Sequence, residues 1–409
     1  MTFPIRSLNP RALVLDGNSQ ASLTVVRSLG RRGVDVSVGS ARRGSIGAHS
    51  RHVDESFVYP DPADEPTAFV DAVVAVLDEA DFEAMIPTRD DTTMVVARYK
   101  DRLAATGTTV GVEDWERFQL VADKARTFEL AADLAVPTPT TRAPESLADV
   151  EAIVDEFDYP VVVKSRSKHV RVDDDHLDMQ TVGDDHYADS PAELVETYRR
   201  LLAANDSFRQ TPPIVQEYVP GQTTTTVGVA DDGEFVTHFQ ERRLRTTPAS
   251  GGSSTLIRGF RDETLREYAE EVVAALEWTG PIQVEFMRTL DDDFALIEVN
   301  GRYWGSTPLA VASGVDIPAV HYALLTGNTP RPQTGYRDDV VQQRLLYGDL
   351  KWFHEQLADG NAWAVVPFVA ALIRAEQVFV STDDPGPTLA AVRQALPLAW
   401  AKLRDIVAS

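Results

Sequence analysis

The segment GPIQVEFMRTLDDDFALIEVNGRYWGS (residues 280–306) decides how this chain is interpreted. Its two alternating apolar runs are separated by a turn rich in aspartate, a pattern that predicts a β-hairpin. If the turn is centred on Asp291-Asp292, Glu285 lies opposite Glu298, and Asn300 shares the face of Glu298. Two opposed carboxylates destabilise a sheet unless a positive charge lies between them, and a hard cation such as Mg²⁺ is the natural candidate. The alternative is a solvated acidic edge in a chain that is acidic throughout.

The composition is that of a soluble globular protein with two or three domains. The chain has 409 residues, of which 43% are hydrophobic. It has no cysteine, which excludes disulfides and thiolate chemistry. No apolar run approaches the roughly 20 residues that span a bilayer, and MTFPIRSLNP lacks the apolar core of a signal peptide. We therefore expect a cytoplasmic protein that does not bind membranes.

The charge balance limits the partners of the protein. A net charge of −24, spread along the whole chain, argues against nonspecific binding to nucleic acid. Only six lysines stand against 33 arginines, and together with the excess of acid this resembles proteins of salt-in halophiles. Because lysine is so scarce, a lysine within a structural motif is more informative about function than usual.

The N-terminal region alternates strands and helices. An apolar strand over 11–16 leads through Gly17-Asn18-Ser19 into a helix-like segment, and a second strand follows at 34–40. This order predicts a parallel sheet, and thus an α/β fold class at the start of the chain. The loop at 87–91 follows another predicted strand, at the sheet edge where α/β proteins bind ligands. An ordinary polar strand-to-helix loop is the alternative there.

The middle of the chain contains further strands. Prolines in VPTPTTRAP (136–144) indicate a linker, and YPVVVKS (159–165) and PIVQEYVPG (213–221) read as strands. The stretch that follows predicts a hairpin turning at Asp232-Gly233, and residues beyond about 331 are helix-like.

Six motifs occur in the order typical of the ATP-grasp superfamily, and the chain resembles that superfamily over roughly residues 120–327. They are Asp123-Lys124, VPTP (136–139), YPVVVK (159–164), QEYVPG (216–221), EF (285–286) and EVNGRYWGS (298–306). The nearest resemblance is to the carbamoyl-phosphate-synthase-like and carboxylate–amine ligase branch.

The resemblance implies an architecture of three parts. These are a Rossmann-like pre-ATP-grasp domain over 1–118, a two-lobed α+β ATP-grasp domain over 119–330, and a mainly helical extension over 331–409. The small lobe is expected at about 137–215 and the large lobe at about 216–330. For the extension we expect helical cover or a homodimer contact.

The resemblance also implies the residues that bind nucleotide. Lys124 and Lys164 match the lysines that neutralise the phosphates, and a lysine at the end of a strand presents a compact charge suited to phosphate. The hinge whose backbone groups bind adenine matches Gln216, Glu217, Tyr218 and Val219. This role requires a strand with a free backbone edge. Gln222 replaces the acid that often binds the ribose.

Glu285, Glu298 and Asn300 match the magnesium ligands of the superfamily, with Mn²⁺ as an alternative metal. Arg302 matches an arginine that contacts the transferred phosphoryl group, for which its fixed fork of donors is suited.

Two stretches depart from the pattern of the superfamily. A glycine-rich phosphate loop usually follows the second lysine, but only Gly183 occurs in that region, so Ser165, Ser167, Lys168 and His169 are the donors left to replace it. Further along that segment, Asp173–Asp175, His176 and His186 suggest either a second metal site or a solvated insertion.

The second departure combines Arg243 and Arg245 with PASGGSST (248–255). It predicts a mobile anion-binding segment that closes over a carboxylate or acyl phosphate. A flexible surface turn is the alternative.

The expected function is an ATP- and Mg²⁺-dependent ligase that joins a small carboxylate to an amine through an acyl phosphate, with ADP as a product. A bicarbonate-activating carboxylase or a kinase of the same superfamily is one alternative. A non-catalytic nucleotide-binding protein is another, because the glycine-rich loop is missing.

Overall fold

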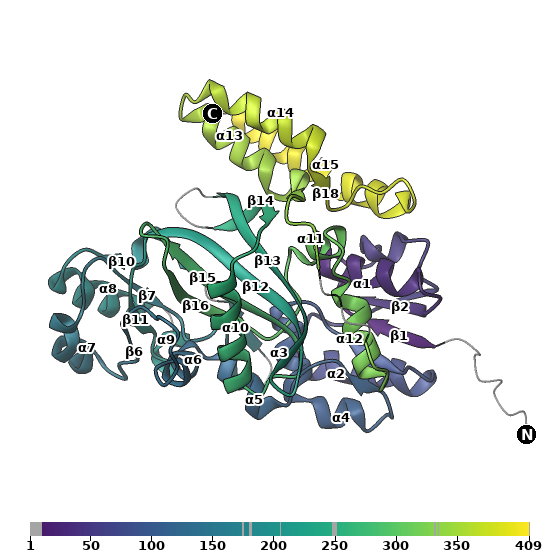
Figure 1. Cartoon of the computed structure of the whole chain (residues 1–409), viewed down its shortest axis with the longest axis horizontal. Helices are drawn as coiled ribbons and strands as arrows, with labels where there is room; N and C mark the ends of the chain where they lie inside the picture. Colours follow the sequence, from purple (N-terminus) through teal and green to yellow (C-terminus); the bar gives the residue numbers. More distant parts are fainter. Residues whose placement is uncertain are drawn as a thin grey trace, which may run out of the picture.

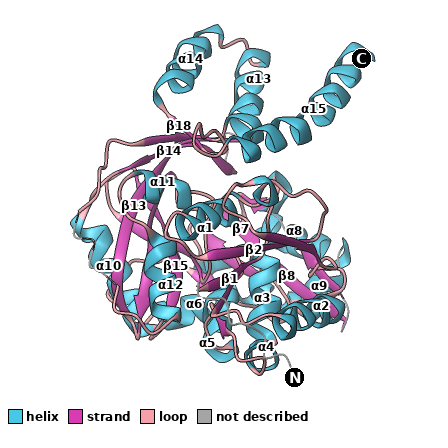
Figure 2. Cartoon of the chain, turned by 90° about the vertical axis from the view of Figure 1, so that its right-hand side faces the viewer, coloured by secondary structure: helices cyan, strands magenta, loops and turns pink. Residues whose placement is uncertain are grey.

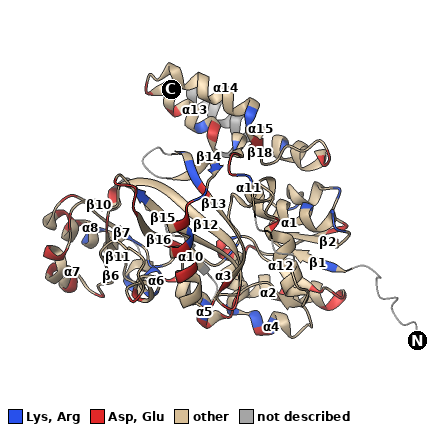
Figure 3. Ribbon diagram, viewed as in Figure 1, with Lys and Arg blue, Asp and Glu red and all other residues tan. Residues whose placement is uncertain are grey.

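The computed structural model describes residues 10–173, 176–179, 182–204, 206–247, 252–330, 333 and 335–408. Figure 1 shows a parallel sheet near the N-terminus, a small sheet at the opposite end, and a large sheet between them. The C-terminal helices project from the large sheet (Figures 1 and 2). This mixed α/β architecture confirms the predicted fold class. Acidic residues are spread over all of these parts (Figure 3).

The N-terminal part is a five-stranded parallel sheet with the strand order β3-β2-β1-β4-β5. Its apolar strands are buried on both faces, as helix-covered parallel strands are. The elements are β1 Arg11–Val14, α1 Gln20–Gly30, β2 Asp35–Ser40, β3 Glu55–Val58, α2 Pro66–Glu79, β4 Ala84–Ile86, α3 Asp90–Arg98, α4 Lys100–Ala104 and β5 Thr109–Val110. Two helices, α5 Trp115–Ala122 and α6 Lys124–Ala131, lead on to the small sheet.

The small sheet is antiparallel, with the order β10-β7-β11-β6. Its elements are β6 Thr141–Arg142, α7 Leu147–Ile153, β7 Val161–Lys164, β10 Tyr187–Ala188, α8 Pro191–Ala204, α9 Asp206–Gln210 and β11 Ile214–Glu217. The proline-rich linker is thus partly structured, because Thr141–Arg142 pair with β11. A hairpin of β8 His169–Asp173 and β9 His176–Met179 occupies the segment that lacks a glycine-rich loop.

The large sheet has the order β16-β15-β12-β13-β14-β17-β18. Its main elements are β12 Gly221–Asp231, β13 Glu234–Thr247, β14 Ser253–Gly259, α10 Glu263–Ala275, β15 Gly280–Thr289, β16 Phe294–Asn300, α11 Thr307–Ala312 and α12 Ile317–Leu325. The predicted turn at Asp232-Gly233 is confirmed, and both of its residues have positive φ. Helix α10 packs on one face of the sheet, and α1, α11 and α12 pack on the other.

The C-terminal region is mainly helical, as expected, but it also contributes two short strands to the large sheet. β17 Val341–Gln343 pairs with β14, and β18 Glu376–Gln377 pairs with β17. The helices are α13 Leu350–Ala358, α14 Val365–Arg374 and α15 Pro385–Ala408. Within the described residues, no helix is both long and apolar enough to cross a membrane.

Candidate active site

Three glutamates lie in one row across the large sheet. Glu285 of β15 pairs with Glu298 of β16 and, on its other side, with Thr225 of β12. Thr225 in turn pairs with Glu241 of β13. The predicted register of the hairpin is therefore confirmed at the two glutamates. A bulge beside Glu285 shifts the register nearer to the turn by one residue.

Basic side chains meet these carboxylates. The Lys124 ammonium lies 2.9 Å from one Glu298 carboxylate oxygen, and the Lys168 ammonium lies 3.5 Å from the other. The Arg243 guanidinium lies 2.7 Å from Glu285. Lys124 is the first residue of α6. The side chain of the N-cap residue Asp123 accepts a hydrogen bond from the Ala125 N–H, and this cap fixes the backbone at Lys124. In this structure the opposed charges of Glu285 and Glu298 are therefore compensated by lysine and arginine side chains of the protein.

Asn300 and Arg302 connect the hairpin to the N-terminal sheet. The Asn300 side-chain oxygen accepts hydrogen bonds of 3.2 Å from both Lys168 and Arg302. Arg302 also forms an ion pair with Asp90, the first residue of α3 in the loop after β4. This contact places the loop at 87–91 beside the hairpin, and its two interpretations stay open. That loop is held by buried Asp16, whose carboxylate accepts the Thr88 N–H at 2.8 Å.

The electrostatics of the site follow from burial and from these neighbours. Burial alone would raise the pKa of Glu298, but the Lys124 and Lys168 ammonium groups hold it well below its usual range. Burial would lower the pKa of Lys168, yet Glu298 and Asp90 raise it. Burial, assisted by the Lys124 charge, lowers the pKa of Lys164 to about 8. The Glu298 carboxylate is thus ionised among ammonium groups, and one of these, that of Lys164, loses its proton near pH 8.

Two neighbouring cavities share Lys164. One of about 330 Å³ is lined by Asp90, Lys124, Lys164, Lys168, His169 and Glu298, among others. The second, of about 450 Å³, is lined by residues that include Lys164, Gln216–Val219, Gln222 and Arg243. The predicted phosphate lysines and the predicted adenine hinge therefore lie beside one another. Gln222 donates a hydrogen bond of 2.8 Å to the Arg243 carbonyl.

The expected free backbone edge begins later than predicted. β11 is an inner strand, so Gln216 and Glu217 pair with β7, and Gln216 also pairs with β6. The Gln216 side chain accepts a 2.7 Å hydrogen bond from Lys164. Tyr218 and Val219 lie beyond the strand, and the Tyr218 side chain is exposed. The Tyr218 N–H donates a 3.0 Å hydrogen bond to the Pro160 carbonyl, so the Val219 N–H is the first backbone donor beyond this pairing.

The expectation of a mobile segment is wrong for Arg243 and Arg245. Both lie on β13 and pair with β14, and Leu244 between them forms a bulge. Arg245 is bound to Asp349 of the C-terminal region at 2.8 Å and lies over the Trp352 ring at 4.0 Å. Sequence reasoning missed these partners because they lie about a hundred residues further along the chain. Residues 248–251 of the glycine-rich stretch lie outside the described residues.

Three site residues were not assigned a role from the sequence. The sequence predicts Lys168 only as a substitute phosphate donor, although its being one of six lysines is a usable signal. Asp90 belongs to a loop for which the sequence allows two interpretations. Glu241 belongs to none of the sequence motifs, and only the register of β13 with β12 places it in line with Glu285 and Glu298. Burial raises its pKa to about 7, although a hydrogen bond from Ser306 and the charge of Arg243 oppose the rise.

The idea of a second metal site receives no support from His186. Its Nδ1 lies 2.9 Å from the Val163 carbonyl, a contact within the small lobe. The side chains of Asp173–Asp175 and His176 lie outside the described residues. Within the described part of the chain, no group of three or more acidic or histidine side chains is placed to hold a metal.

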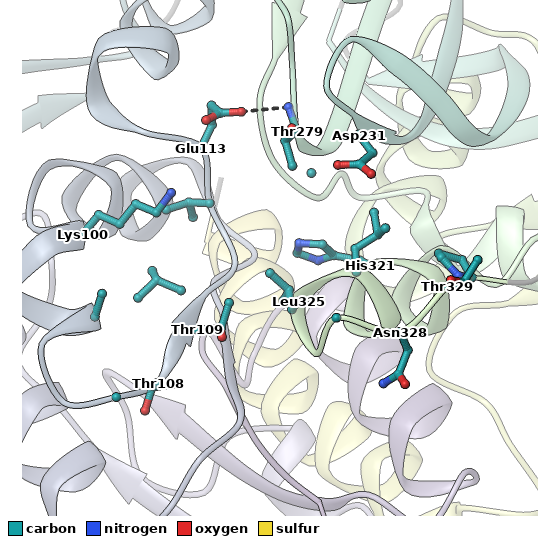
Figure 4. A pocket seen from close by; sticks show the side chains of 18 residues that line it. Lys100, Thr108, Thr109, Glu113, Asp231, Thr279, His321, Leu325, Asn328 and Thr329 are labelled. Carbon is teal, nitrogen blue, oxygen red and sulfur yellow. Dashed lines mark hydrogen bonds between the residues drawn. The ribbon is translucent and has the colours of Figure 1, made fainter.

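A larger cavity, of about 720 Å³, lies away from this site (Figure 4). It is bordered by Lys100 and Glu113 of the N-terminal part and by His321 of α12. Gly280, at the start of β15, also lines it, whereas Glu285 lies five residues further along that strand. None of the predicted site residues borders this cavity.

Residues 209–344 match the protein family described as "ATP-grasp in the biosynthetic pathway with Ter operon". This match, together with the fold and the order of the motifs, supports the ATP-grasp superfamily. It is 23% identical over 292 residues to the carbamoyl phosphate synthase large chain of Clostridium acetobutylicum, covering 68% of this chain and 25% of that protein. The chain thus spans about a quarter of the length of that relative.

Two solved structures illustrate the likeness of fold. Biotin carboxylase from Campylobacter jejuni, in complex with β,γ-ATP, matches with a TM-score of 0.66 and 16% identity, over 81% of this chain and 75% of that chain. L-amino acid ligase from Bacillus licheniformis matches with a TM-score of 0.57 and 16% identity, over 78% of this chain and 74% of that chain.

If Lys164 holds a phosphate of ATP, as the resemblance implies, ATP binding should weaken as the pH rises above about 8. Lys164 is charged below its pKa of about 8 and neutral above it, and phosphate binds the charged form. The dissociation constant for ATP should rise by up to about tenfold per pH unit above that value. Lys164→Arg, which stays charged, should remove the dependence. Calorimetric titration with ATP at a series of pH values measures this dependence. A dissociation constant of the wild type that does not change with pH would contradict the prediction.

Proposed function

We propose that the protein is an ATP- and Mg²⁺-dependent ligase that activates a small carboxylate as an acyl phosphate and transfers the acyl group to an amine. The observation that carries the proposal is the arrangement of Lys124, Lys164, Lys168 and Arg302 around Glu298. A cluster of cations beside ionised carboxylates suits a phosphate chain together with a divalent cation. The match of residues 209–344 to an ATP-grasp family supports the same conclusion.

The donor set fits magnesium. Glu285, Glu298 and the Asn300 side-chain oxygen are hard oxygen ligands, and they lie on adjacent strands. In this structure each is bonded to a basic side chain, which a metal and the nucleotide phosphates together would replace. When bound, Mg²⁺ would neutralise charge on the phosphates of the nucleotide.

The basic side chains would then bind and orient the phosphate groups. Lys124 and Lys164 neutralise negative charge, and Arg302, fixed by Asp90, stabilises the transferred phosphoryl group. A carboxylate oxygen of the substrate attacks the γ-phosphorus while the bond to ADP breaks. The amine nitrogen then attacks the acyl carbon, inorganic phosphate leaves, and the amine releases a proton. Positioning and charge neutralisation account for the catalysis.

A bicarbonate-activating carboxylase is a second candidate. The likeness to biotin carboxylase favours it, because the two folds match over most of both chains. In this case bicarbonate takes the place of the larger carboxylate in the phosphoryl transfer.

Phosphate release tests the proposal. Purified protein is incubated with Mg²⁺-ATP and with pairs of carboxylates and amines, in molar KCl and in low salt. We expect release only when both partners are present, with one ADP and one amide formed per phosphate. Release with bicarbonate and no other acid would favour the carboxylase. ATP binding without release for any mixture would contradict both and favour a non-catalytic nucleotide-binding protein.

A further inference from the structure

The α14 segment (residues 362–373) has an apolar face that the rest of the chain does not cover. Its buried residues, Ala364, Phe368 and Ala371, are spaced by four and three positions and so lie on one face. Phe368 stacks on Phe353 of α13, with ring centroids 4.2 Å apart. Six large apolar side chains, each 39–82% exposed, lie on the other sides; they are Trp363, Val365, Val366, Val369, Leu372 and Ile373. A helix that is apolar on all sides is normally buried on all sides, so a partner from outside the chain is expected to cover this face.

Uncovered apolar surface is concentrated in this part of the molecule. Of the 19 exposed large apolar side chains in the described part of the chain, 12 lie within residues 350–396. In Figure 2, α13 lies between α14 and α15. On α15, Leu389, Val392 and Leu396 form a second exposed stripe, because their spacing of three and four positions places them on one side of the helix. Apolar surface gathered in this way marks a site of interaction with a protein or a membrane.

The charge of the α14 segment selects the partner. The segment contains no charged residue, although the chain holds 63 acidic and 39 basic residues. Helices that lie on lipid surfaces carry lysine and arginine beside their apolar face, and anionic lipids repel a chain with a net charge of −24. A partner with a strongly charged surface would find no opposite charge on this face. A second copy of the chain presents the same uncharged face, so two copies can meet there without opposing carboxylates.

The size of the face also suits a dimer. The six exposed side chains offer roughly 400 Å² of apolar surface, taking about 100 Å² for a whole aliphatic side chain and about 200 Å² for tryptophan. A standard interface buries about 800 Å² on each partner, and about 65% of a homodimer interface, or roughly 500 Å², is apolar. The α14 segment therefore supplies most of the apolar area that one copy must contribute, and the stripe on α15 is available for the rest.

We propose that the protein forms a homodimer in which the α14 segments of two copies pack against each other about a twofold axis. This proposal does not depend on the proposed function. Because both copies carry a net charge of −24, they repel each other outside the contact, and salt screens that repulsion. The dissociation constant of the dimer should therefore fall as the KCl concentration rises.

The mass of the full chain in solution tests the proposal. Sedimentation velocity is measured in molar KCl over a series of protein concentrations, and we expect a dimer with twice the chain mass of 45.0 kDa. Val366→Lys/Ile373→Lys places ammonium groups of both copies in the contact and should give a monomer. Leu290→Lys makes the same change at a side chain that is 81% exposed in the turn between β15 and β16, and should stay dimeric. A monomeric wild type, or a doubly substituted variant that dimerises as tightly as the wild type, would overturn the proposal.

Cysteine cross-linking identifies the face without disturbing the fold. The chain has no cysteine, so a single introduced cysteine can form a disulfide only with the same residue of another copy. Val366→Cys, Val369→Cys and Ile373→Cys are oxidised separately, with Leu290→Cys as the control. We expect a disulfide-linked dimer for at least one of the three and none for the control. If none of the three is linked, α14 is not the contact and the proposal fails.

Vesicle binding separates a second copy from a lipid surface. The wild type is sedimented with vesicles of phosphatidylcholine and phosphatidylglycerol in the same buffer. We expect the protein to stay in the supernatant, since the dimer covers its apolar face. Binding to the vesicles that is lost in Val366→Lys/Ile373→Lys would assign the face to a membrane and overturn the dimer.

Discussion

Replacing Glu298 by glutamine should reduce phosphate release by a factor on the order of 10²–10³, the loss seen when one group that stabilises charge at a reaction centre is removed. The substitution keeps the shape of the side chain but removes a carboxylate that two ammonium groups contact. It also replaces one of the two charged ligands proposed for Mg²⁺ by a neutral amide. The rate is measured at saturating ATP over a series of Mg²⁺ concentrations.

Nucleotide binding provides the control for folding. Without the carboxylate, Lys124 and Lys168 are free to meet phosphate, so Glu298→Gln should bind ATP in EDTA at least as tightly as the wild type. Glu267→Gln makes the same change at an exposed position of α10 and should have no effect on rate. Full turnover by Glu298→Gln would show that the glutamate pair is not the metal site.

Replacing Arg245 by methionine should lower the free energy of unfolding by about 3–5 kcal/mol, the usual cost of breaking a buried ion pair by removing one partner. The side chains of Arg245 and Asp349 are only 8% and 0% exposed. Asp349 would keep hydrogen bonds from Thr255 and Gln343, which are neutral donors. Denaturant unfolding of the variant and the wild type gives the difference.

Arg261 provides a matched control. It too contacts a carboxylate, Asp338, and lies over an aromatic ring, that of Tyr336. Its ion pair is about half exposed, so Arg261→Met should cost less than about 1 kcal/mol. The double variant Arg245→Met/Asp349→Asn should recover part of the lost stability, since no buried charge is left alone. Equal costs at the two arginines would contradict the assignment of Arg245 to the structure of the C-terminal region.

The sequence allowed the local features to be predicted and left the distant ones open. Alternation and a short turn determine which residues of a hairpin face each other, and so the pairing of Glu285 with Glu298 could be derived. The partners of Arg245 and Arg302 could not, because each lies about a hundred residues or more away and is selected by tertiary packing. Glu241 joins the site only through the register of β13 with β12, which no local pattern reveals.

The strands of the C-terminal region also matter for how the protein is handled in the laboratory. β14 is covered on its outer side by β17, so a recombinant fragment that stops before Val341 would expose a bare strand edge. Such edges recruit strands from other molecules and cause aggregation. Recombinant fragments that contain the large sheet should therefore retain the residues through β18, even though the ATP-grasp-like motifs end well before them.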